Sequence, residues 1–241
     1  MTGMFDYLLR VVVSDLDACG KFLTEFVAKA PGVGNIQSSF ALKQVKYKTA
    51  IPVGPPASHQ PGSESVLSAG GARHSPGSSH PVRHYTELDQ FDWKILSALQ
   101  KNARIANVEL AAKVGLSPSP CLARVKVLER DGFISSYVTL LDPLKVGMGV
   151  NLFVQIRLER QIESALTVFE AAVRDRPEIM ECYLMTGTFD YLLRVVVADL
   201  DACQKFVTEF VAKLPGVGNI QSSVALKRVT YKTALPFPKS E

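Results

Sequence analysis

The sequence predicts an α+β protein: a helix-turn-helix (winged-helix-like) domain, then a ferredoxin-like β-α-β-β-α-β domain, with a duplicated β-α-β half-domain in front of both. Three observations predict this class. Residues 88–142 carry three helical segments with a glycine turn between the second and third. Residues 150–231 alternate strand and helix patterns in the ferredoxin-like order. Residues 1–53 repeat the second half of that region.

Length and composition indicate a globular protein with one large or two small domains. The chain has 241 residues, of which 47% are hydrophobic and 21% charged, with a net charge of +4. This mild excess of positive charge excludes a polycation, but it is compatible with a basic surface on one face of the protein. No apolar stretch approaches 18 residues, so a transmembrane span is not expected. No signal peptide is visible in residues 1–10, and we expect a cytoplasmic protein without a membrane partner.

Residues 1–53 and 185–237 align without gaps at an offset of 184. A repeat of this length that occurs twice indicates a duplicated segment rather than a solenoid. Of the 53 aligned pairs, 43 are identical, and the ten that differ are Met4/Thr188, Ser14/Ala198, Gly20/Gln204, Leu23/Val207, Ala30/Leu214, Phe40/Val224, Gln44/Arg228, Lys46/Thr230, Ile51/Leu235 and Val53/Phe237.

Each copy predicts a strand, a helix and a second strand, which in the C-terminal copy cover 190–197, 199–213 and 217–231, so that the first strand of the N-terminal copy corresponds to 6–13. Before the C-terminal copy, the pattern predicts strand 150–158, helix 162–173 and strand 179–186, which together complete the ferredoxin-like order. The N-terminal copy has only the second half and should not close a core alone. Both copies could pair with residues 150–186. We expect the C-terminal copy to pair with residues 150–186, because a short hairpin connects them and closing a longer loop costs more entropy.

The displaced N-terminal copy then has three possible fates. It docks on an exposed sheet edge, swaps between chains, or remains partly disordered. A partial gene duplication without a selected role is the simplest origin.

Residues 54–85 are predicted to form a flexible linker, because 17 of the 32 are Gly, Pro or Ser. All four histidines lie there, where a solvated tail is favoured over a metal site, so no metal or other cofactor is expected. The cysteines (Cys19, Cys121, Cys182 and Cys203) lack C-x-x-C spacing and are interpreted as small buried thiols. The expected domains are 1–53, 54–85, 86–145 and 146–237.

The central segment predicts helices over 89–101, 108–114 and 118–130, with Gly115 in the turn before the third. Ser117 as N-cap and Pro118 at the first helical position mark the start of the third helix, and 133–141 suggests a strand. This is the helix-turn-helix pattern. The exposed face of the third helix should carry Ser119, Leu122, Arg124 and Lys126, with Arg130 at its end. Such a face suits phosphates and base edges, and the alternative is a small protein-interaction bundle.

The segment LDQFDWKILSALQKNARIANVELAAKVGLSPSPCLARVKVLERDGFISSYVTLLDP (88–143), followed by MTGTFDYLLRVVV (185–197), resembles the leucine-responsive regulatory protein/AsnC (Lrp/AsnC) family of transcription regulators. The resemblance covers about residues 86–237. It implies a helix-turn-helix joined by a strand to a ligand-sensing RAM domain, dimers that often assemble into octamers, and small amino acids as effectors.

The resemblance also assigns candidate site residues. Those that match the recognition-helix region are Ser117, Ser119, Pro120, Arg124 and Lys126. Those that match the T-G-x-x-D-Y loop, where effectors are bound, are Thr186, Gly187, Asp190 and Tyr191, with Ser222 and Ser223 as weaker candidates on a strand. Asp190 could pair with an α-ammonium group or simply cap a turn. Ala106 departs from the family, because a Ser there would complete a capping box with Glu109.

The expected function is a sequence-specific DNA-binding transcription regulator responsive to a small amino acid such as leucine, acting as a homodimer or a larger homo-oligomer. The alternative is an amino-acid-sensing or assembly protein whose DNA-binding face is blocked by the N-terminal extension. An enzyme is not expected, because the sequence offers no nucleophile–base pair or cofactor motif.

Overall fold

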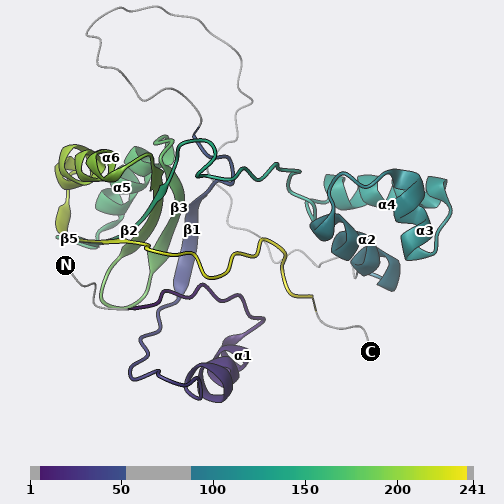
Figure 1. Ribbon diagram of the computed structural model, residues 1–241, viewed down its shortest axis with the longest axis horizontal. Helices are drawn as coiled ribbons and strands as arrows, with labels where there is room; N and C mark the ends of the chain where they lie inside the picture. Colours follow the sequence, from purple (N-terminus) through teal and green to yellow (C-terminus); the bar gives the residue numbers. More distant parts are fainter. Residues whose placement is uncertain (1–5, 53–87, 238–241) are drawn as a thin grey trace, which may run out of the picture. The chain divides into compact units, whose positions relative to one another are not determined.

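The computed structural model describes residues 6–52 and 88–237 and divides them into two compact units (Figure 1). The sheet unit comprises 6–52 with 138–236, and the helical unit comprises 88–137 with Phe237. The expected linker 54–85, with the histidines, lies outside the described residues. No helix in the described ranges is long and apolar enough to cross a bilayer.

The helical unit contains α2 (Gln90–Lys101), α3 (Asn107–Val114) and α4 (Pro118–Arg130), which confirms the three predicted helices. Asp89 and Asp92 form a reciprocal capping box at the start of α2. Ala106 begins α3 without a side-chain hydrogen bond, as expected. The core of the unit consists of Ile95, Leu96, Ala98, Leu110, Ala111, Val114, Cys121 and Leu128.

The turn between α3 and α4 depends on Gly115, whose φ is 80°. Residues with a side chain rarely adopt this left-handed backbone conformation, whereas glycine adopts it at low cost. Ser117 occupies the N-cap position of α4, but its side chain makes no capping hydrogen bond. The start of α4 therefore relies on Pro118 at the first position.

The strand expected over 133–141 is wrong, as is the strand expected to join the two domains: no strand forms between 131 and 149. Tyr137, Val138, Leu140 and Leu141 are all exposed. A β-rich sequence forms a strand only when a neighbouring backbone accepts its hydrogen bonds. Within the described part of the chain, these residues lack such a neighbour.

The sheet unit confirms the ferredoxin-like order. Its elements are β2 (Val150–Leu158), α5 (Glu163–Arg174), β3 (Ile179–Met185), β4 (Tyr191–Val197), α6 (Leu200–Lys205) and β5 (Val217–Val224). A π-helical segment, Phe206–Phe210, and a 3-10 turn, Val211–Lys213, continue α6, so the predicted helix 199–213 is three consecutive segments. All pairings are antiparallel, in the spatial order β1-β3-β4-β2-β5, where β1 (Ala41–Tyr47) comes from the N-terminal copy.

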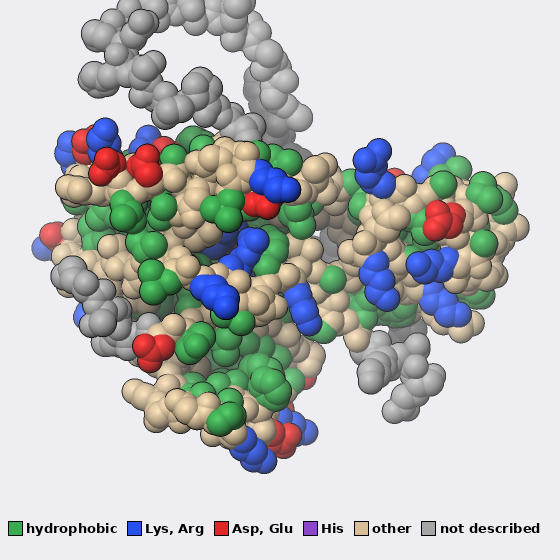
Figure 2. All heavy atoms as spheres, viewed as in Figure 1, with side chains coloured by type: hydrophobic (Ala, Val, Ile, Leu, Met, Phe, Trp, Pro, Cys, Tyr) green, Lys and Arg blue, Asp and Glu red, His purple; other side chains and the backbone are tan. Residues whose placement is uncertain are grey.

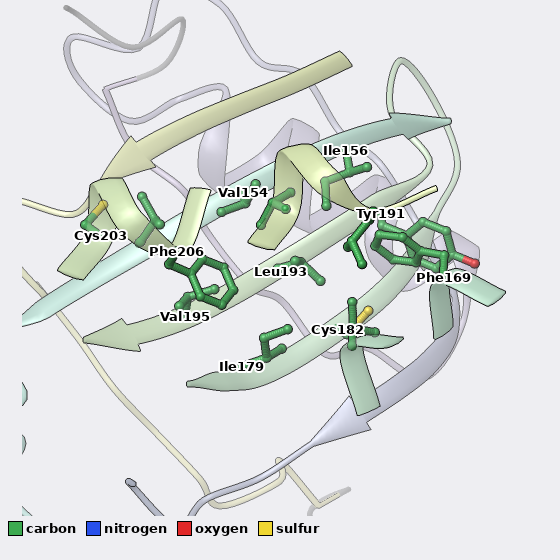
Figure 3. Packing of buried hydrophobic residues seen from close by; sticks show 14 of the residues in the cluster. Val154, Ile156, Phe169, Ile179, Cys182, Tyr191, Leu193, Val195, Cys203 and Phe206 are labelled. Carbon is green, nitrogen blue, oxygen red and sulfur yellow. The ribbon is translucent and has the colours of Figure 1, made fainter. Parts of the chain in front are cut away.

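The core lies between this sheet and its two helices (Figure 3). Every second residue of β2 (Leu152, Val154, Ile156 and Leu158) is buried, as the two-residue period of a strand requires. Phe169 of α5 packs on Tyr191 of β4 with ring centroids 4.3 Å apart. The C-terminal copy therefore supplies β4 and β5, and the expectation that it wins the competition is confirmed.

The N-terminal copy forms helix α1 (Leu16–Lys21), the π-helical segment η1 (Phe22–Val27) and strand β1 (Ala41–Tyr47). Its expected first strand is wrong, because residues 6–13 form none. Tyr7 is 78% exposed, whereas Tyr191, its counterpart in the repeat, is 0% exposed. The physical reason is that residues 150–186 occur once and already pair with the C-terminal copy.

β1 docks on the free edge of β3, which is the first of the three fates considered for the displaced copy (Figure 1). The Lys43 ammonium lies 2.6 Å from the Glu170 carboxylate of α5. The Lys46 side chain, 6% exposed, donates to the carbonyl oxygens of Val173 and Arg176 at the end of α5. The two lysines thus fasten β1 to the helix that covers the sheet.

The final strand is shorter than predicted. β5 ends at Val224, and residues 225–231, expected to continue it, form no strand. Their counterparts in the N-terminal copy, 41–47, are β1. The same segment is thus a strand in one copy and not in the other, because only one of them has a partner edge in this chain.

Burial lowers the pKa of Lys46 to about 8, although Asp175 and Glu178 act in the opposite direction. The folded protein therefore binds fewer protons than the unfolded chain between pH 8 and the ordinary pKa of 10.5. We expect the stability of wild type relative to Lys46→Met to rise as pH increases through this window. Urea unfolding followed by far-UV circular dichroism at pH 7, 8, 9 and 10 measures it. A constant difference across these pH values would contradict the assignment.

Candidate DNA-binding and effector sites

The N-terminal end of α4 presents the residues expected to contact DNA. Ser117, Ser119 and Pro120 are exposed there, and Lys126 is exposed one and a half turns further along the helix. The first backbone N–H groups of a helix have no partner within it and favour anions. Lys and Arg side chains also gather on the face of the helical unit seen in Figure 2. Because Pro118 and Pro120 carry no N–H, this end of α4 offers a phosphate the Ser119 N–H and the hydroxyl groups of Ser117 and Ser119.

Arg124 does not lie on the exposed face of α4, where it was expected. Its Nη1 atom is 2.7 Å from the Asp89 carboxylate and 2.9 Å from that of Asp92, at the start of α2. Its guanidinium lies 5.5 Å from the ring centroid of Phe91. Hydrogen bonds to Asp92 and Asp89 raise the pKa of Arg124. The structure places this side chain in a link between α2 and α4.

A second link between helices was not predicted from the sequence. The Asn107 amide at the start of α3 donates to the carbonyl oxygen of Pro118, at 2.9 Å. This bond holds the first turn of α3 against the first turn of α4. Asparagine at the start of a helix is common, so the sequence carried no specific signal for it.

The predicted effector loop is the hairpin between β3 and β4. Gly187 has φ 109°, a conformation that glycine adopts at low cost. A Cβ atom at this position would lie 3.1 Å from the Ser39 Oγ atom. The shape of this tight hairpin therefore depends on glycine at position 187, directly after Thr186.

Asp190 is a buried residue that fixes this hairpin to β2. Its carboxylate accepts hydrogen bonds from the Leu158 backbone N–H, at 2.7 Å, and from the Gln161 side chain. Its backbone N–H donates to the carbonyl oxygen of Ile156. These contacts match the turn-capping interpretation of Asp190.

Tyr191 lies in the core, with no exposed surface, and does not face a ligand (Figure 3). Its hydroxyl group donates to the Glu170 carboxylate at 3.3 Å, and burial raises its pKa. Ser222 and Ser223 are exposed on β5, opposite Val154 and Phe153 of β2. The structure thus brings together Thr186, Gly187 and Asp190, and places Tyr191, Ser222 and Ser223 elsewhere.

Residues 37–40 of the N-terminal copy run beside this hairpin, which the sequence analysis missed. The Thr186 N–H donates to the Phe40 carbonyl oxygen at 2.9 Å, and the Phe40 N–H donates to Thr186 Oγ1 at 3.0 Å. The Gln37 amide donates to Thr188 Oγ1 at 3.4 Å. The one available signal was that residues 41–47 repeat part of the strand predicted over 217–231. This signal did not reveal the sheet edge on which residues 41–47 dock.

No group of three or more His, Cys, Asp or Glu side chains suited to a metal occurs within residues 6–52 and 88–237. The histidine-rich segment weighed as a metal site lies outside these ranges.

The chain combines a helix-turn-helix unit, the architecture of many DNA-binding domains, with a ferredoxin-like unit. The family model for the Lrp/AsnC ligand-binding domain matches residues 1–51 and 151–235, and that for a winged helix-turn-helix DNA-binding domain matches 88–135. The chain belongs to the Lrp/AsnC family and is a DNA-binding transcription regulator that responds to amino acids.

The similar proteins match about three fifths of this chain and nearly the whole of their own length. The leucine-responsive regulatory protein of Salmonella typhimurium is 44% identical over 149 residues, which are 62% of this chain and 91% of that protein. A Neisseria meningitidis transcriptional regulator solved as an L-Met complex is 42% identical, with a TM-score of 0.60, over 62% of this chain and 97% of that one. An AsnC family regulator from Agrobacterium tumefaciens is also 42% identical, with a TM-score of 0.59, over 61% and 96%.

Replacing Arg124 with alanine should destabilise the helical unit by about 1 kcal/mol, because two ion pairs between α2 and α4 are lost at a partly exposed site. Trp93, the single tryptophan, belongs to this unit and reports its unfolding by urea through fluorescence. Arg130→Ala is the control, since Arg130 pairs only with its neighbour Asp131, and it should leave the midpoint unchanged. Equal midpoints for all three proteins would contradict the role of Arg124.

Proposed function

We propose that this regulator binds DNA through the N-terminal end of α4 and that its effector is a small amino acid such as leucine, bound at the β3–β4 hairpin. The observation that carries the DNA proposal is the exposed start of α4, which presents the hydroxyl groups of Ser117 and Ser119 and the Ser119 N–H, a group without a partner inside the helix. Hydroxyls and N–H groups suit phosphates and base edges, and Lys126 adds a positive charge one and a half turns further along.

Arg124 has a positioning role in this proposal. Its bonds to Asp89 and Asp92 hold α4 on α2 and so fix the angle at which α4 enters the groove. A homodimer, which could assemble further into an octamer, would present two such helices about 34 Å apart, one helical turn of DNA. We place the protein in the cytoplasm and assign it no enzymatic activity.

The effector proposal rests on the hairpin and on the relatives. One relative is named for its response to leucine, and another was solved with L-methionine. Gly187 carries no side chain that would keep a small ligand from the backbone of the hairpin, and residues 37–40 of the N-terminal copy occupy this position in the structure. Both oxygens of Asp190 already accept hydrogen bonds, so this residue shapes the loop, and an α-ammonium group would be a third partner.

We expect Lys126→Ala to weaken DNA binding about equally on all sequences, because a lost phosphate contact carries no base information. The slope of the logarithm of the association constant against the logarithm of the salt concentration should become shallower by about one. Gel-shift titrations at several salt concentrations, on DNA upstream of the protein's own gene and on unrelated DNA, measure this. An unchanged salt dependence would contradict the contact.

The matched comparison is the full chain beside residues 86–241, which lack the N-terminal copy and the expected linker. Binding by both supports the regulator. Binding by the short protein alone makes residues 1–85 inhibitory, the alternative in which the extension blocks the DNA-binding face. Failure of both, on the gene's own upstream DNA and with amino acids present, would contradict the proposed DNA site.

Gly187→Ala should abolish the change in DNA binding that an amino acid causes and leave DNA binding without amino acid within about twofold. A methyl group at φ 109° and 3.1 Å from Ser39 would force the hairpin into another shape. Gel shifts with leucine and methionine measure the response. Gly34→Ala is the control, because nothing lies within 4 Å of its Cβ position. An intact response in Gly187→Ala would move the effector site away from the hairpin.

A further inference from the structure

The N-terminal copy carries an apolar face that its twin buries and that it does not bury itself. Eight side chains of the C-terminal copy belong to the core of the sheet unit, and each is at most 9% exposed (Figure 3). Their counterparts at the offset of 184 are all partly or fully exposed. Seven of the eight pairs are identical: Tyr191/Tyr7, Leu193/Leu9, Val195/Val11, Val197/Val13, Cys203/Cys19, Phe206/Phe22, Val211/Val27 and, as the one difference, Leu214/Ala30.

The structure shows which surface this face fits, because the C-terminal copy is packed on it. β4 lies between β2 and β3, and β5 pairs with β2, so the copy as a whole covers residues 150–185. The polar contact at its start is repeated as well. The Asp190 carboxylate accepts a hydrogen bond from the Leu158 N–H at 2.7 Å, and the counterpart of Asp190 is Asp6. Residues 6–40 therefore carry the groups that bind this surface.

One carboxylate already contacts the same arginine of both copies. Glu181 of β3 accepts a hydrogen bond from Arg194 of β4 at 2.9 Å. Its second oxygen lies 3.4 Å from Nη1 of Arg10, the counterpart of Arg194. The N-terminal copy thus reaches an acceptor that its twin uses within the sheet.

The chain connections permit the two copies to change places. β5 ends beside the start of β2, where the Ala225 N–H donates to the Asn151 carbonyl oxygen at 2.9 Å. With the copies exchanged, Ala41 stands at the position of Ala225, and residues 42–149 form the loop that leads back to β2. The entropy cost of closing a loop grows only with the logarithm of its length. The exchanged fold is a circular permutation of the present one and needs no threading of the chain.

We propose that the apolar face of the N-terminal copy is a docking surface for residues 150–185 of the same chain, and that the two copies exchange on these residues. In the exchanged fold, residues 7–13 replace β4, residues 33–40 replace β5, and the C-terminal copy is released. The partner is the same chain because both segments lie on one polypeptide, which gives them a high effective concentration.

Two differences make the exchanged fold the minor state. The C-terminal copy closes a shorter loop, and its Leu214 fills core space that Ala30 would leave empty. Both differences are small beside the shared core, so the two packings of nearly one sequence lie close in free energy.

Cysteine pairs trap each fold in the full-length chain with Cys19 and Cys203 replaced by alanine, which keeps the copies matched. Ser222 lies opposite Val154 of β2, so Ser222→Cys with Val154→Cys (the Ser222 pair) reports the present fold. Ser38→Cys with Val154→Cys (the Ser38 pair) reports the exchanged fold, because Ser38 is the counterpart of Ser222 and Val154 is 0% exposed. Non-reducing gels after timed oxidation measure the rate of each intrachain product, and Val154→Cys alone is the blank.

Ala30→Leu gives the N-terminal copy the core side chain that it lacks and should raise the rate of the Ser38 product at least threefold. Leu9→Asp should abolish this product. Leu9 is 57% exposed in the present fold, but its counterpart Leu193 is 0% exposed, so the exchanged fold would bury a charge there. The Ser222 product should be unaffected by Leu9→Asp.

Three results would overturn the proposal: no intrachain Ser38 product even with Ala30→Leu, a product that Leu9→Asp leaves unchanged, or a product that forms only between two chains. Circular dichroism and the Ser222 product show that each variant is folded. These outcomes do not depend on DNA or effector binding.

Discussion

Residues 150–186 are present once, while the segment that pairs with them is present twice, and this imbalance determines the rest of the sheet unit. β2 has two edges, and β4 and β5 of the C-terminal copy occupy both. Tyr7 and Tyr191 occupy equivalent positions in two copies that are identical at 43 of 53 aligned positions. Yet Tyr7 is exposed and Tyr191 lies in the core. Burial in this protein is therefore decided by available partners and not by local sequence.

The leftover copy is stabilised through the edge that a ferredoxin-like sheet leaves open. An unpaired edge strand invites association with other chains, and proteins usually cover it. Here β1 covers β3, and Lys43 joins it to Glu170, which also accepts a hydrogen bond from Tyr191 in the core. The edge and the core thus share one buried carboxylate, and the covering strand is attached to the part of the unit that is most firmly packed.

The sequence predicted the elements whose ends are set by local chemistry. Pro118 and Gly115 mark α4 and the turn before it, and both were placed correctly. The strands expected over 6–13 and 133–141 were wrong, and the strand expected over 217–231 ends at Val224, because a strand needs a partner that no local pattern reveals. The candidate site divides in the same way. The exposed start of α4 was predictable, whereas the ion pairs of Arg124 were not, because its partners Asp89 and Asp92 lie more than 30 residues away in the sequence.

The N-terminal copy lies against the hairpin that we propose as the effector site. Residues 37–40 contact Thr186 and Thr188 of the hairpin and lead directly into β1. If β1 leaves the β3 edge, these contacts must break, and the hairpin becomes accessible to a ligand. A ligand that binds only the accessible hairpin would therefore favour the state in which β1 is displaced, and displacement of β1 would increase the affinity for that ligand by the same factor. In the proposed effector site, the affinity for the ligand therefore depends on how tightly β1 holds the β3 edge.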